Sequence, residues 1–148
     1  MIFRETTPAD IQSLFYVRSR TRENTYSLEE LERAGITEQS VTEKLSSSYK
    51  GWLCEISNSV VGFSMADKAT GELWVIAVLP DFERKGIGNH LMALAEEWLW
   101  QMGCDNAWLT TSINTNLRAY GFYLNRGWVD HKIEDGLRYM QLFPPQRA

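Results

Sequence analysis

The sequence predicts an α/β (α+β) fold of one domain, in which a central mixed, mostly antiparallel twisted sheet carries helices on both faces. Two observations lead to this prediction. Apolar residues recur at helical spacing in the N-terminal part and again from Ile87 to Met102, whereas residues 52–78 form short apolar runs separated by turns. Strands and helices mixed in this order are expected to pack as helices over a sheet.

Composition and charge agree with a single globular unit. The chain has 148 residues, and residues 1–148 are predicted to form one domain. Fifteen Lys and Arg against nineteen Asp and Glu give a net charge of -4, which argues against a nucleic-acid partner. No apolar run approaches the roughly 18 residues of a membrane span, so no membrane partner and a cytoplasmic location are expected. Cys54 and Cys104 lie in apolar segments, which suits a reducing compartment.

Three helices are expected in the N-terminal part. Thr7 is suited to cap the first helix, with Pro8 at its first position. Ser27 and Glu30 have the spacing of a capping box ahead of the second helix. The third helix is expected over residues 38–46.

Strands dominate the middle of the chain. Residues 52–56 and 60–66 flank a turn and predict a hairpin. Residues 72–78 form a nearly continuous apolar run, as expected of a central strand covered on both faces. The remaining predicted elements are a long helix from Gly86 to Gly103, a strand over 107–111, a short helix over 117–126, and a last hairpin over 128–133 and 137–143.

The segment between the central strand and the long helix has the features of an anion site. Gly86, Ile87 and Gly88 stand at the predicted helix start, where the first backbone N–H groups have no partner within the helix. Glycine lets the main chain approach a phosphate closely. Arg84 and Lys85 add two positive charges. A plain helix start remains the alternative interpretation of the two glycines.

Two familiar nucleotide-binding loops are excluded. The dinucleotide fingerprint needs a third glycine or alanine where Leu91 stands. The Walker loop needs a Gly-Lys-Ser/Thr triplet, which the sequence lacks. A phosphate-bearing ligand other than NAD or ATP is therefore expected.

A second pattern lies on the short helix expected over residues 117–126. Asn116, Ala119 and Tyr123 are spaced so that they would share one helix face, presenting an amide, a small residue and a phenol. The alternative interpretation makes Tyr123 a core aromatic residue. A separate apolar stripe suited to packing is formed by Leu117, Tyr120 and Leu124.

Together these two segments resemble the GNAT superfamily of acyl-CoA-dependent N-acetyltransferases. Its members carry a Gln/Arg-x-x-Gly-x-Gly/Ala loop between strand and helix, followed later by Asn-x-x-Ala-x-x-Phe-Tyr-x-x-x-Gly-Phe. The matching residues are Gly86, Ile87, Gly88, Asn116, Ala119, Phe122, Tyr123 and Gly127. Trp128 replaces the usual Phe, and Glu83 replaces the usual Gln or Arg. Because its carboxylate would repel a pyrophosphate, Glu83 is expected to point away, with Arg84 and Lys85 supplying positive charge.

The resemblance implies an enzyme that transfers the acetyl group of acetyl-CoA to a primary amine, without a metal. Tyr123 is implied as the acid that protonates the leaving thiolate, and Glu72 as the base, with a water chain as the alternative. The main chain of the central strand is implied to bind the pantetheine arm. The implied cofactor-binding residues are Ile76, Val78, Arg84, Lys85, Gly86, Ile87, Gly88, Asn116, Ala119 and Tyr123.

The residues leave several alternatives open. A non-catalytic CoA-binding sensor or scaffold would need the glycine loop but neither Tyr123 nor Glu72. The acceptor can be a small amine, an amino acid, a peptide or a protein, and a homodimer is also open. Three basic residues near the first helix end allow an acceptor with a carboxylate: Arg18, Arg20 and Arg22. Hydrolysis through Ser64 is disfavoured because this serine lies inside a predicted strand rather than on a sharp turn.

Overall fold

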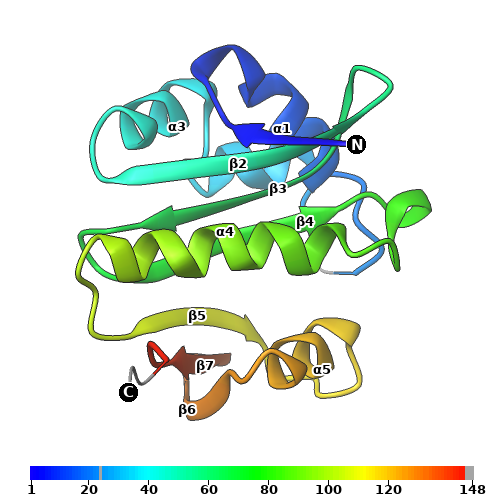
Figure 1. Ribbon diagram of the computed structural model, residues 1–148. Coiled ribbons are helices and arrows are strands. Elements are labelled where there is room, and N and C mark those ends of the chain that lie inside the picture. Colours follow the sequence, from blue (N-terminus) through cyan, green and yellow to red (C-terminus); the bar gives the residue numbers. More distant parts are fainter. Residues whose placement is uncertain (24, 146–148) are drawn as a thin grey trace.

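The computed structural model describes residues 1–23 and 25–145 (Figure 1). Within these residues the strands form one sheet, whose members in spatial order are β1 (Ile2–Glu5), β2 (Tyr49–Ile56), β3 (Ser59–Asp67), β4 (Glu72–Val78), β5 (Ala107–Ser112), β7 (Leu137–Leu142) and β6 (Val129–Glu134). All neighbours in this order pair antiparallel except β4 and β5, which are parallel. The predicted mixed, mostly antiparallel sheet is confirmed.

Helices cover both faces of this sheet. They are α1 (Ile11–Arg18), α2 (Leu28–Arg33), α3 (Glu38–Leu45), α4 (Ile87–Gln101) and α5 (Arg118–Asn125), with 3-10 turns η1 (Pro8–Asp10) and η2 (Pro80–Phe82). Figure 1 shows α4 lying over one face of the sheet, roughly along the direction of the central strands. Buried residues of α4 and α5 form one core with that face, and those of α1 and α3 form a second core with the other. None of the helices in the described part of the chain is long and apolar enough to cross a bilayer.

Local signals account for the helix starts. The Ser27 hydroxyl accepts the Glu30 N–H at 3.1 Å, and the Glu30 carboxylate accepts the Ser27 N–H, so the predicted capping box before α2 is confirmed. The short strand β1 was not predicted. It pairs with β2 at the sheet edge, and Arg4 there donates to Glu55 at 2.7 Å. Four residues are too few to show an alternating pattern, and this pairing decides their conformation.

Strand β4 contains an irregularity that changes which way its side chains point. Met65 and Ala66 of β3 pair with Val75 and Leu73, so Trp74 is an extra residue without a partner on β3. Such a β-bulge re-aims side chains. Trp74 and Val75 both pack on the α1 and α3 core, whereas Leu73 packs on the α4 core.

The parallel strands β4 and β5 separate soon after they meet. Their one register pair among the described residues is Glu72 with Trp108. Only Leu73 and Ala77 of β4 are fully buried, so the prediction that this strand is covered on both faces was only partly right. The rest of β4 is half-buried because the strand borders an opening instead of a neighbouring strand.

Candidate active site

The separation of β4 and β5 opens a cleft of about 820 Å³. Its lining comes from both strands, from α1, α5 and the first turn of α4, and from the connection between α1 and α2. The structure brings together eight predicted site residues there, namely Glu72, Ile76, Val78, Arg84, Gly86, Gly88, Ala119 and Tyr123.

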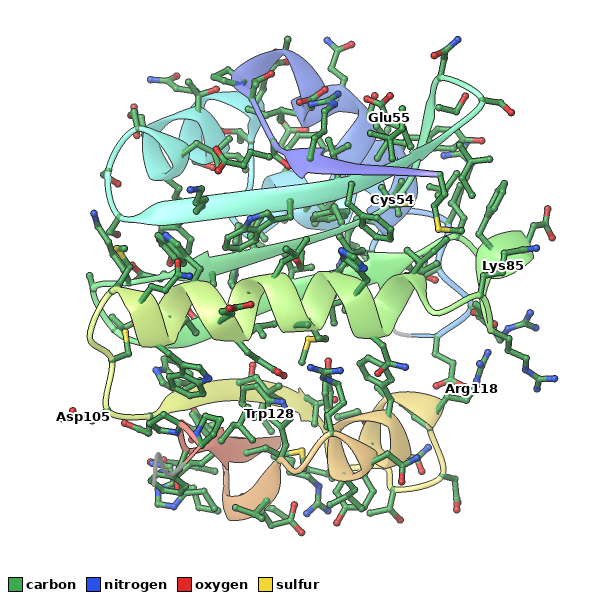
Figure 2. All side chains as sticks on the ribbon, viewed as in Figure 1. Cys54, Glu55, Lys85, Asp105, Arg118 and Trp128 are labelled. Atoms are coloured by element: carbon green, nitrogen blue, oxygen red, sulfur yellow. The ribbon has the colours of Figure 1, made fainter. Side chains whose placement is uncertain are left out.

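Three predicted residues are not part of this lining. Lys85 is exposed on the loop before α4, as Figure 2 shows, and the Ile87 side chain is buried in the core. Asn116 precedes α5, so the prediction that it shares a helix face with Ala119 was wrong. The side chain of Asn114 accepts the Asn116 N–H at 3.0 Å, and this local turn delays the helix until after Leu117.

Among the residues that the structure describes, no side chain caps the first turn of α4. Gly86 is its N-cap residue with φ of 81°, a left-handed conformation that glycine adopts without strain. A Cβ built on Gly88 would lie 3.5 Å from the Phe122 ring, which is ordinary contact. Since the first N–H groups of a helix have no intrahelical partners, they are available to an anion in the cleft.

Glu83 lies beside this turn, and its charge is neutralised by two arginines. Its carboxylate accepts the Arg22 Nε–H at 3.1 Å and a hydrogen bond from the Arg118 guanidinium. Burial favours the neutral carboxyl, but the hydrogen bonds from Arg118 and Arg22 outweigh it and lower the pKa of Glu83. The expectation that Glu83 points away from the site is therefore not met, because this residue lines the cleft while its charge is paired.

Tyr123 is both a core residue and part of the cleft wall. It is 8% exposed and packs against Phe122 and Trp128. Burial raises the pKa of Tyr123 to about 12, and the positive charge of Arg18 acts in the opposite direction. The phenol therefore keeps its proton at neutral pH and can act as a donor.

Glu72 lies where β4 and β5 are still paired. Burial raises the pKa of its carboxyl, the negative charge of Asp67 adds to this rise, and Lys44 opposes it. A carboxylate with a raised pKa holds a proton more strongly than an ordinary glutamate does. Glu72 is thus better suited than an ordinary glutamate to accept a proton inside the cleft.

The three basic residues near the end of α1 have separate positions. Arg18 and Arg22 line the cleft, whereas Arg20 is exposed and stacks on the Tyr16 ring at 3.9 Å. The Arg18 Cζ lies 4.4 Å from the centroid of the Tyr26 ring. Burial lowers the pKa of Arg18, while the neighbouring tyrosines act in the opposite direction.

Sequence reasoning missed several residues of this cleft. Tyr26 and Arg118 belong to no motif, and Trp74 enters the wall because of the bulge. No local signal indicates that Arg118 meets a residue 35 positions earlier.

The predicted packing stripe on α5 is also only partly right. Leu124 is 43% exposed, and the Tyr120 hydroxyl donates to Asp130 at 2.8 Å outside the cleft. The residue of α5 that is buried is Tyr123, because this helix rests on the sheet along the face that carries it.

Two other chemistries find no support in the geometry. Ser64 is fully buried within β3 and donates to the Leu91 carbonyl at 3.1 Å, so it cannot present a nucleophile. Over residues 1–23 and 25–145, no three metal-ligating side chains gather at one place.

Comparisons with known proteins agree with this geometry. The model of the acetyltransferase (GNAT) family matches residues 11–128. The PaiA N-acetyltransferase of Thermoplasma acidophilum, solved in complex with coenzyme A, is 17% identical, with a TM-score of 0.82 over 97% of this chain and 100% of that chain. No curated protein matches the sequence.

Two further solved structures share the fold. The ribosomal-protein-S18-alanine N-acetyltransferase of Escherichia coli is 17% identical, with a TM-score of 0.75 over 99% of this chain and 97% of that chain. The YncA protein of Salmonella typhimurium, solved with its cofactor acetyl-CoA, is 15% identical, with a TM-score of 0.75 over 100% of this chain and 96% of that chain. Because the family model covers most of the sequence and includes both motifs, the chain belongs to the GNAT family of acetyltransferases.

Proposed function

We propose that residues 1–148 act as one N-acetyltransferase domain, which transfers the acetyl group of acetyl-CoA to a primary amine by direct attack. The observation that carries this proposal is the divergence of β4 from β5 beside Tyr123. After Glu72, no strand within residues 1–23 and 25–145 pairs with this edge of β4, and the cleft there also contains the uncapped start of α4.

The lining residues suit the chemistry of acetyl-CoA. The first turn of α4 offers N–H groups to phosphates, and Arg84 adds positive charge in the same wall. The β4 main chain at Ile76 and Val78 offers polar groups to the amides of a pantetheine arm. The small Ala119 leaves room beside Tyr123. When bound, acetyl-CoA supplies an activated thioester.

The residues of the cleft can stabilise the charge that develops in the reaction, and they can accept and donate the protons that it moves. Unpaired N–H groups on the β4 edge can stabilise a developing oxyanion. The attacking amine must be neutral, and Glu72 or a water chain can accept its proton. Tyr123 can protonate the leaving thiolate. Burial raises the pKa of Tyr123 and so makes its proton harder to release, but the same burial raises the pKa of a thiol, so the two effects on the transfer oppose each other.

Turnover of acetyl-CoA in the presence of an amine panel tests the proposal. The panel contains amino acids, polyamines and peptides with free N-termini, and thiol release is followed against a no-amine blank. We expect at least one amine to give thiol release and a matching acetylated product. A protein that binds CoA but acetylates none of these amines would favour the non-catalytic sensor or scaffold.

A further inference from the structure

Three segments that are distant in the sequence meet beside the start of α4, where hydrogen bonds join them (Figure 1). The connection between α1 and α2 contributes Arg22 and Glu23, the loop before α4 contributes Glu83, and the start of α5 contributes Arg118. Together these four residues form the Glu83 cluster. All four line the cleft.

Glu83 is the centre of this cluster. Its side chain is only 18% exposed, whereas those of Arg22 and Arg118 are 55% and 46% exposed. Arg118 is fixed a second time, because its backbone N–H donates to the Glu23 carboxylate at 2.9 Å. The carboxylate of Glu83 is thus a mostly buried acceptor that orients two more exposed side chains.

Each arginine uses only part of its hydrogen-bonding capacity on Glu83. Arg22 donates through Nε, and Arg118 donates through one terminal nitrogen. A guanidinium has five N–H donors. Among the described residues the other guanidinium donors of these two arginines have no partner, so both side chains retain donors for an anion.

The charge at this end of the cleft favours an anion. Arg22, Arg84 and Arg118 outnumber the carboxylates of Glu23 and Glu83 in the lining. The bare N–H groups at the start of α4 lie in the same wall. Two guanidiniums held in place can bind phosphate oxygens with charge-assisted hydrogen bonds.

We propose that Arg22 and Arg118 form a clamp for phosphate groups of the acyl donor, and that Glu83 is the residue that positions the clamp. This inference rests on the proposed function. It explains how a carboxylate is compatible with the position where related sequences carry Gln or Arg. Glu83 makes no contact with phosphate itself and instead orients two arginines that do.

A positioning role for Glu83 and simple repulsion of phosphate by Glu83 predict opposite effects of Glu83→Gln on CoA binding. If Glu83 only repelled phosphates, Glu83→Gln would tighten CoA binding. If Glu83 positions the clamp, the same substitution weakens CoA binding although it removes a negative charge. The sign of the change therefore separates the two explanations.

The experiment measures dissociation constants by calorimetry at physiological salt, for CoA and for pantetheine, which lacks phosphates. We expect the Kd for CoA to rise about fivefold or more in Arg22→Gln and Arg118→Gln, and about threefold or more in Glu83→Gln. The Kd for pantetheine is expected to stay unchanged in all three. The Kd for dephospho-CoA, which lacks the 3′-phosphate, then shows which phosphate the clamp binds. If the substitutions no longer change this Kd, the clamp binds the 3′-phosphate. If they still raise it, the clamp binds the pyrophosphate.

Two charge-matched variants serve as controls. Arg20→Gln removes a positive charge two residues from Arg22, and Asp81→Asn removes a negative charge two residues from Glu83, and neither residue lines the cleft. Both are expected to bind CoA within about twofold of the wild type.

The clamp is wrong if Glu83→Gln binds CoA at least as tightly as Asp81→Asn does, or if pantetheine binding weakens equally in the cluster variants. The test does not depend on turnover. A chain that binds CoA through the clamp but acetylates no amine would refute only the proposed function, and active enzyme with unaffected variants would refute only the clamp.

Discussion

At the scale of single residues, the chemistry depends on whether the Tyr123 hydroxyl gives its proton to the leaving thiolate. Tyr123→Phe is expected to keep the fold and CoA affinity while lowering kcat at least tenfold, because general acid catalysis contributes about 10²–10⁴-fold. Steady-state kinetics with any accepted amine measures this. Tyr120→Phe is the control, since its hydroxyl donates to Asp130 outside the cleft and kcat should change little. A wild-type kcat in Tyr123→Phe would contradict the assignment.

Glu72 gives a prediction about pH. Burial and Asp67 raise the pKa of Glu72, so its carboxylate form, which a base requires, is lost as the pH falls through a value above that of an ordinary glutamate. We expect kcat/KM to decline on the acid side through this pKa. In Glu72→Gln the part of this decline that the carboxyl causes should disappear, leaving only the fall caused by protonation of the acceptor amine. The rate at neutral pH should be at least about tenfold lower than that of the wild type.

The matched control for Glu72→Gln is Glu97→Gln on the exposed side of α4. It removes the same charge without touching the cleft, so its pH profile should follow the wild type. An unchanged acid limb in Glu72→Gln would instead favour a water chain as the route for the proton.

At the scale of elements, the first turn of α4 is bare because Gly88 has no side chain. A Cβ there would make ordinary contact with Phe122, so Gly88→Ala should fold and gain about 0.5–1 kcal/mol of helix stability. We expect it to weaken CoA binding, because the added methyl group blocks the close approach of a phosphate. Calorimetry and thermal unfolding together measure both effects.

Gly121→Ala is the control for this substitution. A Cβ on Gly121 meets nothing within 4 Å, and this residue of α5 does not line the cleft. It should show a similar gain in the free energy of unfolding with no change in CoA affinity. Equal CoA affinity in Gly88→Ala and Gly121→Ala would mean that the glycine loop serves only to start the helix.

A second prediction at this scale concerns how α4 is joined to the C-terminal hairpin. The Trp128 indole N–H donates to the buried Glu96 carboxylate at 2.9 Å, and Arg126 donates to the same carboxylate at 2.6 Å. This bond explains why a tryptophan suits the position where related sequences carry phenylalanine. Trp128→Phe should lower the free energy of unfolding by about 2 kcal/mol, since a hydrogen bond to a charged group is worth about 1.5–3 kcal/mol.

Chemical denaturation of Trp128→Phe beside Trp108→Phe checks this value. Trp108 also donates from its indole, to the Thr70 carbonyl at 3.1 Å, but it is only half-buried and its acceptor is uncharged. Trp108→Phe should therefore lower the free energy of unfolding by less than Trp128→Phe does. Equal losses would show that the charged acceptor adds nothing.

At the scale of the whole molecule, ligand binding should stabilise the native state. CoA or acetyl-CoA at a hundredfold excess over Kd adds about 2.7 kcal/mol to the free energy of unfolding. For a chain of this length that is a rise of about 5–10 °C in Tm. NADH and ATP should raise Tm much less, because the sequence has neither the dinucleotide fingerprint nor the Walker loop. If NADH or ATP raises Tm as much as CoA does, the assignment of acetyl-CoA as the cofactor is wrong.

Much of the fold could be predicted because its signals are local. The capping box at Ser27 and Glu30 and the long helix after Gly86 depend on residues a few positions apart, and both form as predicted. β1 was missed because its conformation comes from pairing with residues about fifty positions later. Asn116 was misplaced because a turn made by Asn114 competes with the helix at its start.

By itself the sequence determined most of the segments that form helices and strands, β1 excepted, and that a glycine loop and the helix with Tyr123 occur in the GNAT order. The tertiary structure alone decided that Trp74 is a bulge residue, that β4 and β5 part after Glu72, and that a cleft forms between them. It also decided the environment of Glu83, which meets arginines 61 positions before it and 35 positions after it. Strand register and ion pairs of this kind depend on contacts across the folded chain, and no periodicity within a segment encodes them.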